Sequence, residues 1–413
     1  MENGVLIAHL FRTEYRKVVS VLCKHFGLDQ MEVAEDIASE TFLKASETWG
    51  LKGVPPNPVA WLYHVARNNA VNRLRRDALF ARKIVPELGP LSPGVFHAVI
   101  DLSPQNITDS QLQMMFAICH PSISPEAQVG LSLRILCGFG IDEIADAFLT
   151  NRETINKRLF RAREKLREAQ IPITFPPPDS IDGRLDAVLT TIYLLFNEGY
   201  YSVSQNTVLR KDLCLEAMRL CNMLVENPRT NKPVVNALLA LMCFHASRFE
   251  ARFDADGALV LYEEQDTSLW SPELIARGEY FLQCSASGPV ASAYHLQAGI
   301  AYWHTRAGDG QDKWEQILQL YNKLLVVEYS PVAALNRTYA LARARGKAEA
   351  LGEALKLALE ENRFYWALLG ELYTGSDDGV ARQRFEQALA MARTPAEREV
   401  LQKKIDCLTT STP

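Results

Sequence analysis

The 413-residue sequence lacks the patterns that would place it among membrane or secreted proteins. No run of eighteen apolar residues occurs, which argues against a membrane-spanning helix. The start, MENGVLIAHLFRTEYRK, has no basic leader and too short an apolar run for a secretory signal. We therefore expect a cytoplasmic protein without a membrane partner.

Signatures of common enzyme chemistry are missing as well. The sequence contains no glycine-rich phosphate loop, no G-x-S-x-G and no H-E-x-x-H. Asn197 and Glu198 in LLFNEGY could form a polar site, but a helix end before Gly199 explains them equally well. We expect no enzymatic activity and no cofactor.

Eight cysteines are present, but none forms a C-x-x-C pair. Most lie in apolar segments, and in a cytoplasmic chain of this size we expect small, reduced core residues. Cys119 with His120, and Cys23 with His25, could be imagined as metal ligands. Because neither pair has a second pair at zinc spacing, we predict no metal site.

Charge is distributed unevenly along the chain, although the net charge is only −5. Residues 1–170 contain 20 Lys and Arg against 19 Asp and Glu, whereas residues 171–413 contain 24 against 30. Residues 151–170 alone hold seven cations and three acids. Positive charge gathered in short segments is typical of contacts with nucleic-acid grooves or backbones.

Helical periodicity dominates the chain, and no sustained period-two alternation indicates a strand. The best linkers are the proline-rich segments 86–108 and 171–182, because the residue before a proline is pushed out of the helical region. The sequence therefore predicts an all-α protein with helical domains at 1–85 and 109–170 and a larger C-terminal part at 183–413.

The C-terminal part contains an internal repeat of 34 residues. This spacing separates Leu335 from Leu369, Tyr339 from Tyr373, Leu351 from Phe385, Ala354 from Ala388, and Ala358 from Ala392. Thirty-four residues is the period of the tetratricopeptide repeat, a pair of helices that stacks on its neighbours. A coincidental amphipathic helical hairpin is the alternative. Either reading predicts a helical stack, which is typical of partner binding rather than chemistry.

Residues 57–76, NPVAWLYHVARNNAVNRLRR, place an aromatic ring, amides and arginines on one helix. The side expected to face the core carries Leu62, Val65, Ala66 and Ala70. The candidate DNA-binding residues form a separate stripe with its flanking arginines: Trp61, His64, Arg67, Asn68, Asn72, Arg73, Arg75 and Arg76. Rings stack on unpaired bases, Asn binds base edges, and Arg neutralises phosphate. Alternatively, Trp61 is a core residue and the arginines are simply solvated.

A second basic helix, RETINKRLFRAREKLREA, follows the short amphipathic segment 140–149. Thr150 and Glu153 fit a capping box at its start. Its expected buried stripe is Ile155, Leu159, Ala162 and Leu166. The residues left to point outward are Arg152, Thr154, Asn156, Lys157, Arg158 and Arg161. Two helices joined by a tight turn, the second of them basic, describe a helix-turn-helix that reads the DNA major groove.

Two segments together resemble the bacterial sigma factors. DIASETFLKASETW with NPVAWLYHVARNNAVNRLRR is similar to their promoter-melting domain. PEAQVGLSLRILCGFGIDEIADAFLTNRETINKRLFRAREKLRE is similar to their C-terminal helix-turn-helix domain, although family members often have Gly where this chain has Leu149 and Thr150. With only these two domains, the chain resembles the extracytoplasmic-function group. MFAICHPSISPEAQVGLSLRILCGF, LLFNEGY and KWEQILQLYNKLLVVEYSPVAALNR resemble segments of the subgroup with a tetratricopeptide-like C-terminal domain.

The resemblance implies that core RNA polymerase and promoter DNA, both as duplex and as melted non-template strand, are the partners. Trp61 to Arg76 would bind the minus-ten element, and Arg152 to Arg161 would read the minus-thirty-five element. The helix from about Met31 to Trp49 would contact the polymerase clamp helices through its acids Glu32, Glu35, Asp36, Glu40 and Glu47. For the first three acids, a favourable interaction with the helix dipole is the alternative. The part at 183–413 would be regulatory, and we expect it to contact the first two domains within the chain.

A helix-turn-helix transcriptional regulator with a tetratricopeptide-like sensor domain is the alternative function. It accounts for residues 109–413, but it leaves the acidic helix at 31–49 and the aromatic stripe unexplained. Dependence on core polymerase separates the two hypotheses, because a repressor binds its duplex site alone, whereas a sigma factor does so poorly.

Overall fold

The computed structural model describes residues 2–84, 100–148, 150–200, 210–252, 254, 260, 262–288, 291–306, 308, 310–392 and 395–410. Within these ranges every regular element is a helix, so the predicted all-α fold is confirmed. The chain divides into two compact units, Met1–Leu195 and Phe196–Pro413. Most of the predicted linker at 86–108 lies outside the described residues, and so does Leu149 of the predicted turn.

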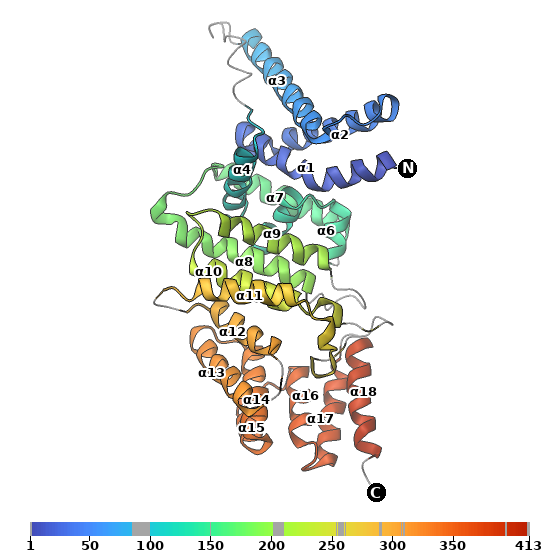
Figure 1. The fold of residues 1–413 in the computed structure, drawn as a ribbon, viewed down its shortest axis with the longest axis vertical. Coiled ribbons are helices and arrows are strands. Elements are labelled where there is room, and N and C mark those ends of the chain that lie inside the picture. The colour runs from blue at the N-terminus through green and yellow to red at the C-terminus, as the bar shows by residue number, and fades with distance from the viewer. Residues whose placement is uncertain are drawn as a thin grey trace. The chain divides into compact units, whose positions relative to one another are not determined.

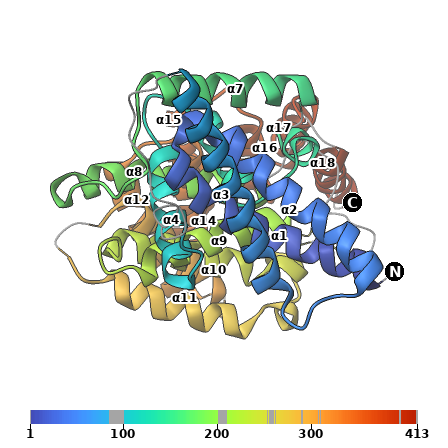
Figure 2. The same cartoon turned by 90° about the horizontal axis from the view of Figure 1, so that it is seen from above.

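The first unit begins with three long helices, α1 (Glu2–Phe26), α2 (Met31–Lys52) and α3 (Pro58–Ile84). Helices α1 and α2 run side by side (Figures 1 and 2), and both bury apolar side chains such as Val18, Leu22 and Phe42. Gly27 has a φ of 88° where the chain leaves α1. Because this backbone conformation favours glycine, it permits the sharp reversal that brings α2 back along α1.

The rest of the first unit consists of α4 (Pro104–Ile118), α5 (Pro125–Leu131), a π-helical turn at Ser132–Leu136, α6 (Ile141–Ala147), α7 (Arg152–Glu168) and the start of α8 (Ile181–Tyr200). Ser103 and Ser124 cap α4 and α5, and a proline follows each cap at the first helical position. Because α4 packs on α1, helices from both 1–85 and 109–170 share one compact unit.

Most of α8, as far as Leu195, belongs to the first unit. Its apolar side chains Leu185, Val188 and Ile192 are buried. Arg184 donates a hydrogen bond to the carbonyl oxygen of Phe116, and Thr191 Oγ1 donates to Gln128 Oε1 at 2.9 Å. Residues 183–195, which we assigned to the C-terminal part from the sequence, therefore lie in the same unit as α4 and α5.

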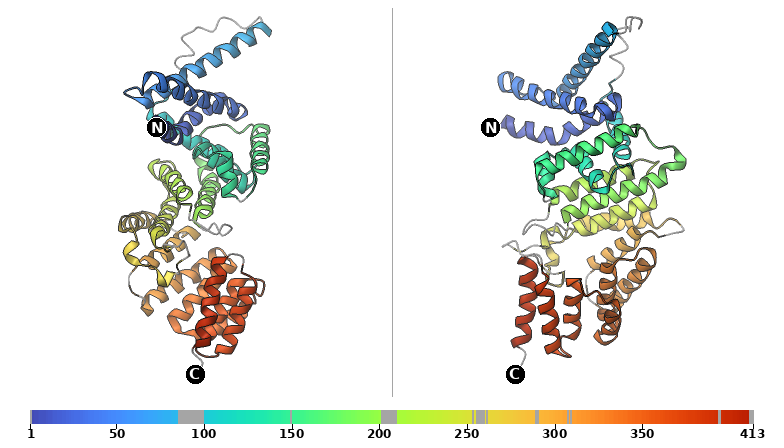
Figure 3. Two further views of the ribbon diagram at one scale, coloured as in Figure 1. Left: turned by 90° about the vertical axis from the view of Figure 1, so that its right-hand side faces the viewer. Right: turned by 180° about the vertical axis from the view of Figure 1, so that it is seen from behind.

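The second unit is a series of helices: α9 (Lys211–Glu226), α10 (Pro233–Ala246), α11 (Pro272–Ser285), α12 (Ala293–Thr305), α13 (Gln311–Val327), α14 (Pro331–Arg345), α15 (Lys347–Leu357), α16 (Arg363–Tyr373), α17 (Asp378–Ala390) and α18 (Pro395–Thr410). Helix α10 is apolar around nearly its whole circumference, because it packs against α9, α11 and α12. Helices α16, α17 and α18 stand side by side (Figure 3).

The 34-residue spacing marks equivalent positions in two helical hairpins. Leu335 and Leu369 are buried in α14 and α16, and Ala354 and Ala388 are buried in α15 and α17. Helices α16 and α17 approach closely at Gly370, where an added Cβ would lie 2.6 Å from the ring of Phe385. Only a residue without a side chain fits at this contact.

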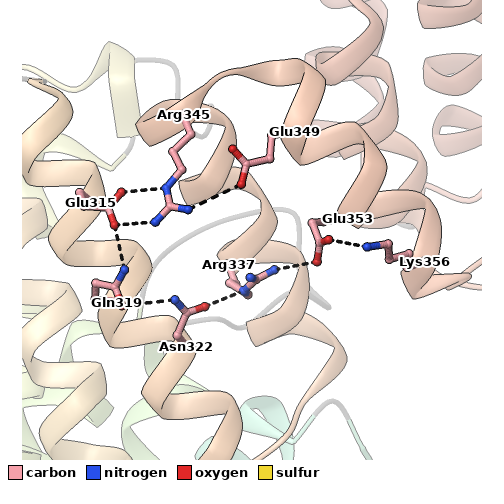
Figure 4. Close-up of polar contacts among 8 residues, drawn as sticks. All are labelled: Glu315, Gln319, Asn322, Arg337, Arg345, Glu349, Glu353 and Lys356. Atoms are coloured by element: carbon pink, nitrogen blue, oxygen red, sulfur yellow. Dashed lines mark hydrogen bonds and ion pairs between the residues drawn. The ribbon is translucent and has the colours of Figure 1, made fainter.

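A row of polar side chains connects α13, α14 and α15 (Figure 4). Arg345 donates to both carboxylate oxygens of Glu315, at 2.8 and 3.1 Å. Arg337 donates to Asn322 at 2.7 Å and to Glu353 at 3.4 Å. The hydrogen bonds from Arg345 lower the pKa of Glu315 to about 2, so this carboxylate stays charged across the physiological range.

Candidate nucleic-acid interface

Helix α3 forms with one face buried, as its sequence predicts. Asn57 precedes the helix, and its Oδ1 accepts a hydrogen bond from Ala60 N at 3.0 Å. Pro58 occupies the first helical position, where its missing N–H costs nothing. The predicted core face is confirmed, because all four of its side chains are at most 7% exposed: Leu62, Val65, Ala66 and Ala70.

The predicted DNA-binding side chains of α3 lie away from this core face. Six are exposed: His64, Arg67, Asn72, Arg73, Arg75 and Arg76. Asn68 is half-buried, and its Nδ2 lies 2.9 Å from His64 Nε2. The pair occupies neighbouring turns of one helix, so an imidazole and an amide lie together on a helix that also exposes four arginines.

Trp61 is half-buried at the edge of this stripe. Its ring meets that of Trp49 edge to face, with centroids 5.4 Å apart and the planes 63° apart. Trp49, near the end of α2, is only 1% exposed. The buried ring therefore supports one side of Trp61 and leaves the rest of Trp61 at the surface. Trp49 was not among the residues singled out from the sequence.

The start of α7 differs from the capping box predicted at Thr150. The N-cap is Asn151, whose Oδ1 accepts a hydrogen bond from Thr154 N at 2.8 Å. Thr150 instead donates its backbone N–H to the carbonyl oxygen of Ala145 at 2.9 Å. Thr150 thus closes the preceding helix, and Asn151 takes the capping position, for which Asn is the better residue.

Helix α7 buries the predicted stripe and exposes cations on other sides. Its four apolar residues are at most 3% exposed: Ile155, Leu159, Ala162 and Leu166. Arg152, Asn156, Lys157 and Arg161 are exposed, and Thr154 and Arg158 are half-buried. Two of the cations have acidic neighbours, since Arg152 lies 3.6 Å from Asp142 and Lys157 lies 2.6 Å from Glu153.

A groove of about 410 Å³ runs between α7 and the start of α5. Its α7 side carries Thr154, Lys157, Arg158, Arg161 and Lys165, and its other side carries Ile123, Ser124 and Ala127. The guanidinium of Arg158 also stacks over the Phe148 ring, 5.3 Å from its centroid. Lys165 was missed in the sequence, although it lies one helical turn after Arg161. Four cations beside one groove favour a polyanionic partner.

The acids predicted to bind polymerase occupy two different environments on α2. Glu32, Asp36, Glu40 and Glu47 are exposed. They share the helix surface with two exposed leucines that the sequence reading missed, Leu43 at 62% and Leu51 at 88%. Glu35, by contrast, is only 9% exposed and binds Arg134 at 3.0 Å and Arg163 at 2.9 Å.

The motif LLFNEGY, at the end of α8, is part of the second unit from Phe196 onward. Gly199 lies against α9, where an added Cβ would be 2.8 Å from the Cys214 sulfur. Burial raises the pKa of Glu198. The Arg252 guanidinium stacks on the Tyr200 ring, 3.9 Å from its centroid. Close helix packing therefore accounts for the glycine of this motif.

The cysteines follow the expectation of a reduced core with two exceptions. Six of the eight are free and buried, whereas Cys284 is half-buried and Cys407 is exposed. In the part of the chain that the structure describes, His, Cys, Asp and Glu side chains nowhere gather in threes around a possible metal position. Among the described helices, none is both long and apolar enough to cross a bilayer.

Comparison with known proteins links these features to two families. Residues 10–79, which include α2 and most of α3, match the family Sigma-70 region 2. Residues 184–286 match a family of unknown function, DUF6596. A protein of Rhizobium meliloti (strain 1021) that is described as uncharacterized is 34% identical over 400 residues, which cover 95% of this chain and 93% of that protein. No solved structure matches the chain.

The match to Sigma-70 region 2 covers the helices with the aromatic and basic stripe and with the exposed acids. It supports a role in transcription initiation with core RNA polymerase and promoter DNA as partners. Residues 10–79 of this chain form a sigma-70 region 2 domain. The chain as a whole belongs to the same family as the Rhizobium meliloti protein.

Proposed function

We propose that this protein is an extracytoplasmic-function sigma factor that directs core RNA polymerase to specific promoters and opens them. In this proposal residues 1–85 melt the promoter, residues 109–170 are a helix-turn-helix domain and residues 183–413 regulate activity, with linkers at 86–108 and 171–182. The protein acts in the cytoplasm and catalyses no reaction of its own.

Helix α3 would capture the melted non-template strand. Unstacking a base costs a few kcal/mol per step, so a surface that binds only the extruded base can offset the cost of melting. Trp61 offers a ring supported from behind by Trp49, and the neighbouring His64 and Asn68 offer groups that bind base edges. The exposed arginines Arg73 and Arg76 supply charge for the phosphates.

Helix α7 would read duplex DNA at the upstream element. It starts immediately after α6 and a short turn, the arrangement in which a second helix enters the major groove. Thr154, Asn156 and Arg158 lie in its N-terminal half, the part of such a helix that contacts base edges. Lys157 and Arg161 flank them with positive charge.

Helix α2 would bind the polymerase. Exposed acids spread over about four turns, from Glu32 to Glu47, suit a basic partner surface. The exposed side chain of Leu43 lies between Glu40 and Glu47 and would supply apolar contact area. Glu35 does not belong to this exposed set, because two arginines of the same unit already bind it.

The second unit would be a tetratricopeptide-like regulatory stack. Support comes from the 34-residue spacing of buried residues in α14–α17 and from the close packing of α16 on α17 at Gly370. Such stacks bind partners along an extended surface. We propose that this stack also contacts the DNA-binding domains of its own chain.

The observation that carries the proposal is the pair of differently built basic helices in one unit, one with a supported ring and one beside a cationic groove. Run-off transcription with core polymerase on a library of upstream DNA regions tests it. We expect transcription from a small set of promoters that depends on this protein. Tight binding to duplex DNA without core polymerase, and no transcripts with it, would instead indicate the helix-turn-helix regulator.

A further inference from the structure

A cavity of about 290 Å³ lies in the second unit, where the end of α9, the start of α10 and the second half of α11 meet. At about 30 Å³ for each water molecule, it has room for roughly ten waters, which is the size of a small metabolite. The polar groups on its wall are two amides, an ammonium, a phenol, a thiol and a hydroxyl, contributed by Asn231, Asn236, Lys232, Tyr280, Cys284 and Ser287. A concave site with a few polar groups is typical of small-molecule binding.

Buried side chains hold one side of this cavity in place. Helix α10 packs against α9, α11 and α12, and its Val235 is fully buried. In the connection between α9 and α10, Thr230 is also fully buried, and its Oγ1 donates a hydrogen bond to the carbonyl oxygen of Leu224 at 2.6 Å. The backbone N–H of Asn231 donates to the carbonyl oxygen of Asn227 at 2.9 Å. The α9–α10 side of the cavity is therefore preformed, as most ligand sites are.

Asn236 presents a hydrogen-bond acceptor to the cavity. The residue is only 5% exposed, and its Nδ2 donates to Asn231 Oδ1 at 2.7 Å and to the carbonyl oxygen of Lys232 at 3.0 Å. Both amide hydrogens are thus used, whereas no residue in the described part of the chain donates to Asn236 Oδ1. A buried acceptor without a donor is costly, so this oxygen favours a ligand that brings an N–H or O–H group.

The start of α10 favours an anion beside that acceptor. Helix α10 begins at Pro233, and its N-cap residue, Lys232, makes no side-chain cap to the first turn. Helix N-termini attract anions through their N–H groups and the helix dipole, and Lys232 adds a positive charge to the cavity wall. Among the described residues that line the cavity, none is Asp or Glu. A carboxylate is therefore matched here, whereas an ammonium group is not.

We propose that this cavity binds a small hydroxycarboxylate, a ligand with a carboxylate and a neighbouring hydroxyl group on an apolar body. The carboxylate would lie between Lys232 and the start of α10, and the hydroxyl would donate to Asn236 Oδ1. The apolar body would contact Val225, Pro233 and the ring of Tyr280, which is 62% exposed. A hydroxyl suits Asn236 better than an amine, because an amine would bring a second positive charge toward Lys232.

Alkylation of Cys284 in the full-length chain reports whether the cavity is occupied. Cys407 is replaced by serine, because it is exposed and the other six cysteines are buried. Labelling with iodoacetamide is followed by peptide mass spectrometry. Three probes of similar shape differ in one group, since 3-phenyllactate carries a hydroxyl, phenylalanine carries an ammonium, and 3-phenylpropionate carries neither.

We expect 3-phenyllactate to slow the alkylation of Cys284 at least several-fold at saturation. The other two probes should need roughly tenfold higher concentrations for half protection. For phenylalanine the reason is repulsion between its ammonium and Lys232. For 3-phenylpropionate the reason is that it leaves Asn236 Oδ1 without a donor.

Two substitutions separate the two halves of the recognition. Lys232→Gln should weaken protection by 3-phenyllactate and by 3-phenylpropionate by a similar factor, because both carry the carboxylate. Asn236→Ala should weaken only 3-phenyllactate and so remove its preference over 3-phenylpropionate. The matched control is Lys323→Gln, an exposed lysine of α13 that does not line the cavity. Circular dichroism and a cooperative melt establish folding, and where Asn236→Ala does not fold, Lys232→Gln decides.

A second measurement does not depend on the thiol. Bound 3-phenyllactate should raise the melting temperature of the wild-type chain and should have a smaller effect on Lys232→Gln at the same concentration. Protection that is absent up to the solubility limit of 3-phenyllactate would overturn the site, and so would equal protection in folded Lys232→Gln and wild type. Equal half-protecting concentrations of the three probes would overturn the assignment to a hydroxycarboxylate. None of these measurements involves polymerase or DNA, so their failure is distinct from failure of the sigma-factor proposal.

Discussion

Trp49 and Trp61 meet edge to face, with ring centroids 5.4 Å apart, at the point where α2 ends and α3 begins. Trp49 is 1% exposed, so its position is set by the core. Because Trp61 leans on a fixed ring, less side-chain freedom remains to be lost when a base stacks on it. The tryptophan pair therefore connects the packing of the domain to the proposed opening of the promoter.

Replacement of Trp61 should impair opening of the DNA strands but leave the initial binding of duplex DNA unchanged. Loss of a base–aromatic stack costs about 1–3 kcal/mol, so Trp61→Ala should lower the fraction of opened promoters by roughly one to two orders of magnitude. Permanganate reactivity of unpaired thymines measures opening, and gel shift on ice measures the closed complex. Tyr329→Ala, which removes a 65% exposed ring from the second unit, is the control.

Arg158 should contribute to binding of duplex DNA at the upstream element. Arg158→Ala removes one of four cations beside the α7 groove, so affinity should fall and the slope of log K against log salt should decrease by about one. Arg167→Ala removes a cation from the same helix outside that groove and should leave the slope unchanged. Identical slopes for wild type and Arg158→Ala would contradict a phosphate contact.

Charge reversal on α2 should weaken association with core polymerase. Asp36→Lys and Glu40→Lys change exposed carboxylates, so the fold should persist while a basic partner is repelled. We expect the association rate to fall most at low salt, as measured by surface plasmon resonance. Glu328→Lys, an exposed charge reversal in the second unit, is the matched control. Recovery of no core enzyme by wild type at low salt would reject the docking surface itself.

The second unit should lose stability as the pH falls from 7 to 5. Burial, together with Arg248 and Lys313, lowers the pKa of His304 to about 3. In the unfolded chain His304 binds a proton near pH 6.5, whereas in the folded chain it stays neutral. The free energy of unfolding is therefore highest above that pH and declines below it. The decline should reach about 2 kcal/mol at pH 5.

Urea unfolding of wild type and His304→Asn at both pH values isolates this contribution. The variant should be less stable than wild type at pH 7. The difference between their free energies of unfolding should narrow by about 2 kcal/mol at pH 5. His245 contributes in the same direction, because burial and the nearby arginines lower its pKa as well.

Periodicity predicted the local structure of both DNA-binding helices. Apolar residues such as Leu62 in α3 and Leu159 in α7 recur every third or fourth position, and all the predicted stripe residues are buried. The cap of α7 was predicted one residue too early. Thr150 and Asn151 both have side chains suited to an N-cap, and only the backbone bond from Thr150 to Ala145 decides between them.

Contacts between distant segments could not be predicted in this way. In the sequence Glu35 looks like its neighbours Glu32 and Asp36, and nothing local distinguishes it. Its burial depends on Arg134 and Arg163, which are brought to it by the packing of the second part of the unit on α1 and on the turn Leu28–Gln30 before α2. The same applies to α8, whose Thr191 bonds with Gln128 after a proline-rich segment that reads as a domain boundary.

The contact of Gly370 with Phe385 has a consequence for how the 34-residue repeats can be recombined. The equivalent residues of the preceding hairpin are Asn336 and Leu351, so one hairpin combines the smallest residue with a large ring and the other does not. Exchange of a single helix between the hairpins would place a side chain where the Phe385 ring sits, or remove the ring from a site shaped for it. When a repeat is duplicated or transplanted, both helices of its hairpin, α14 with α15 or α16 with α17, must therefore move together.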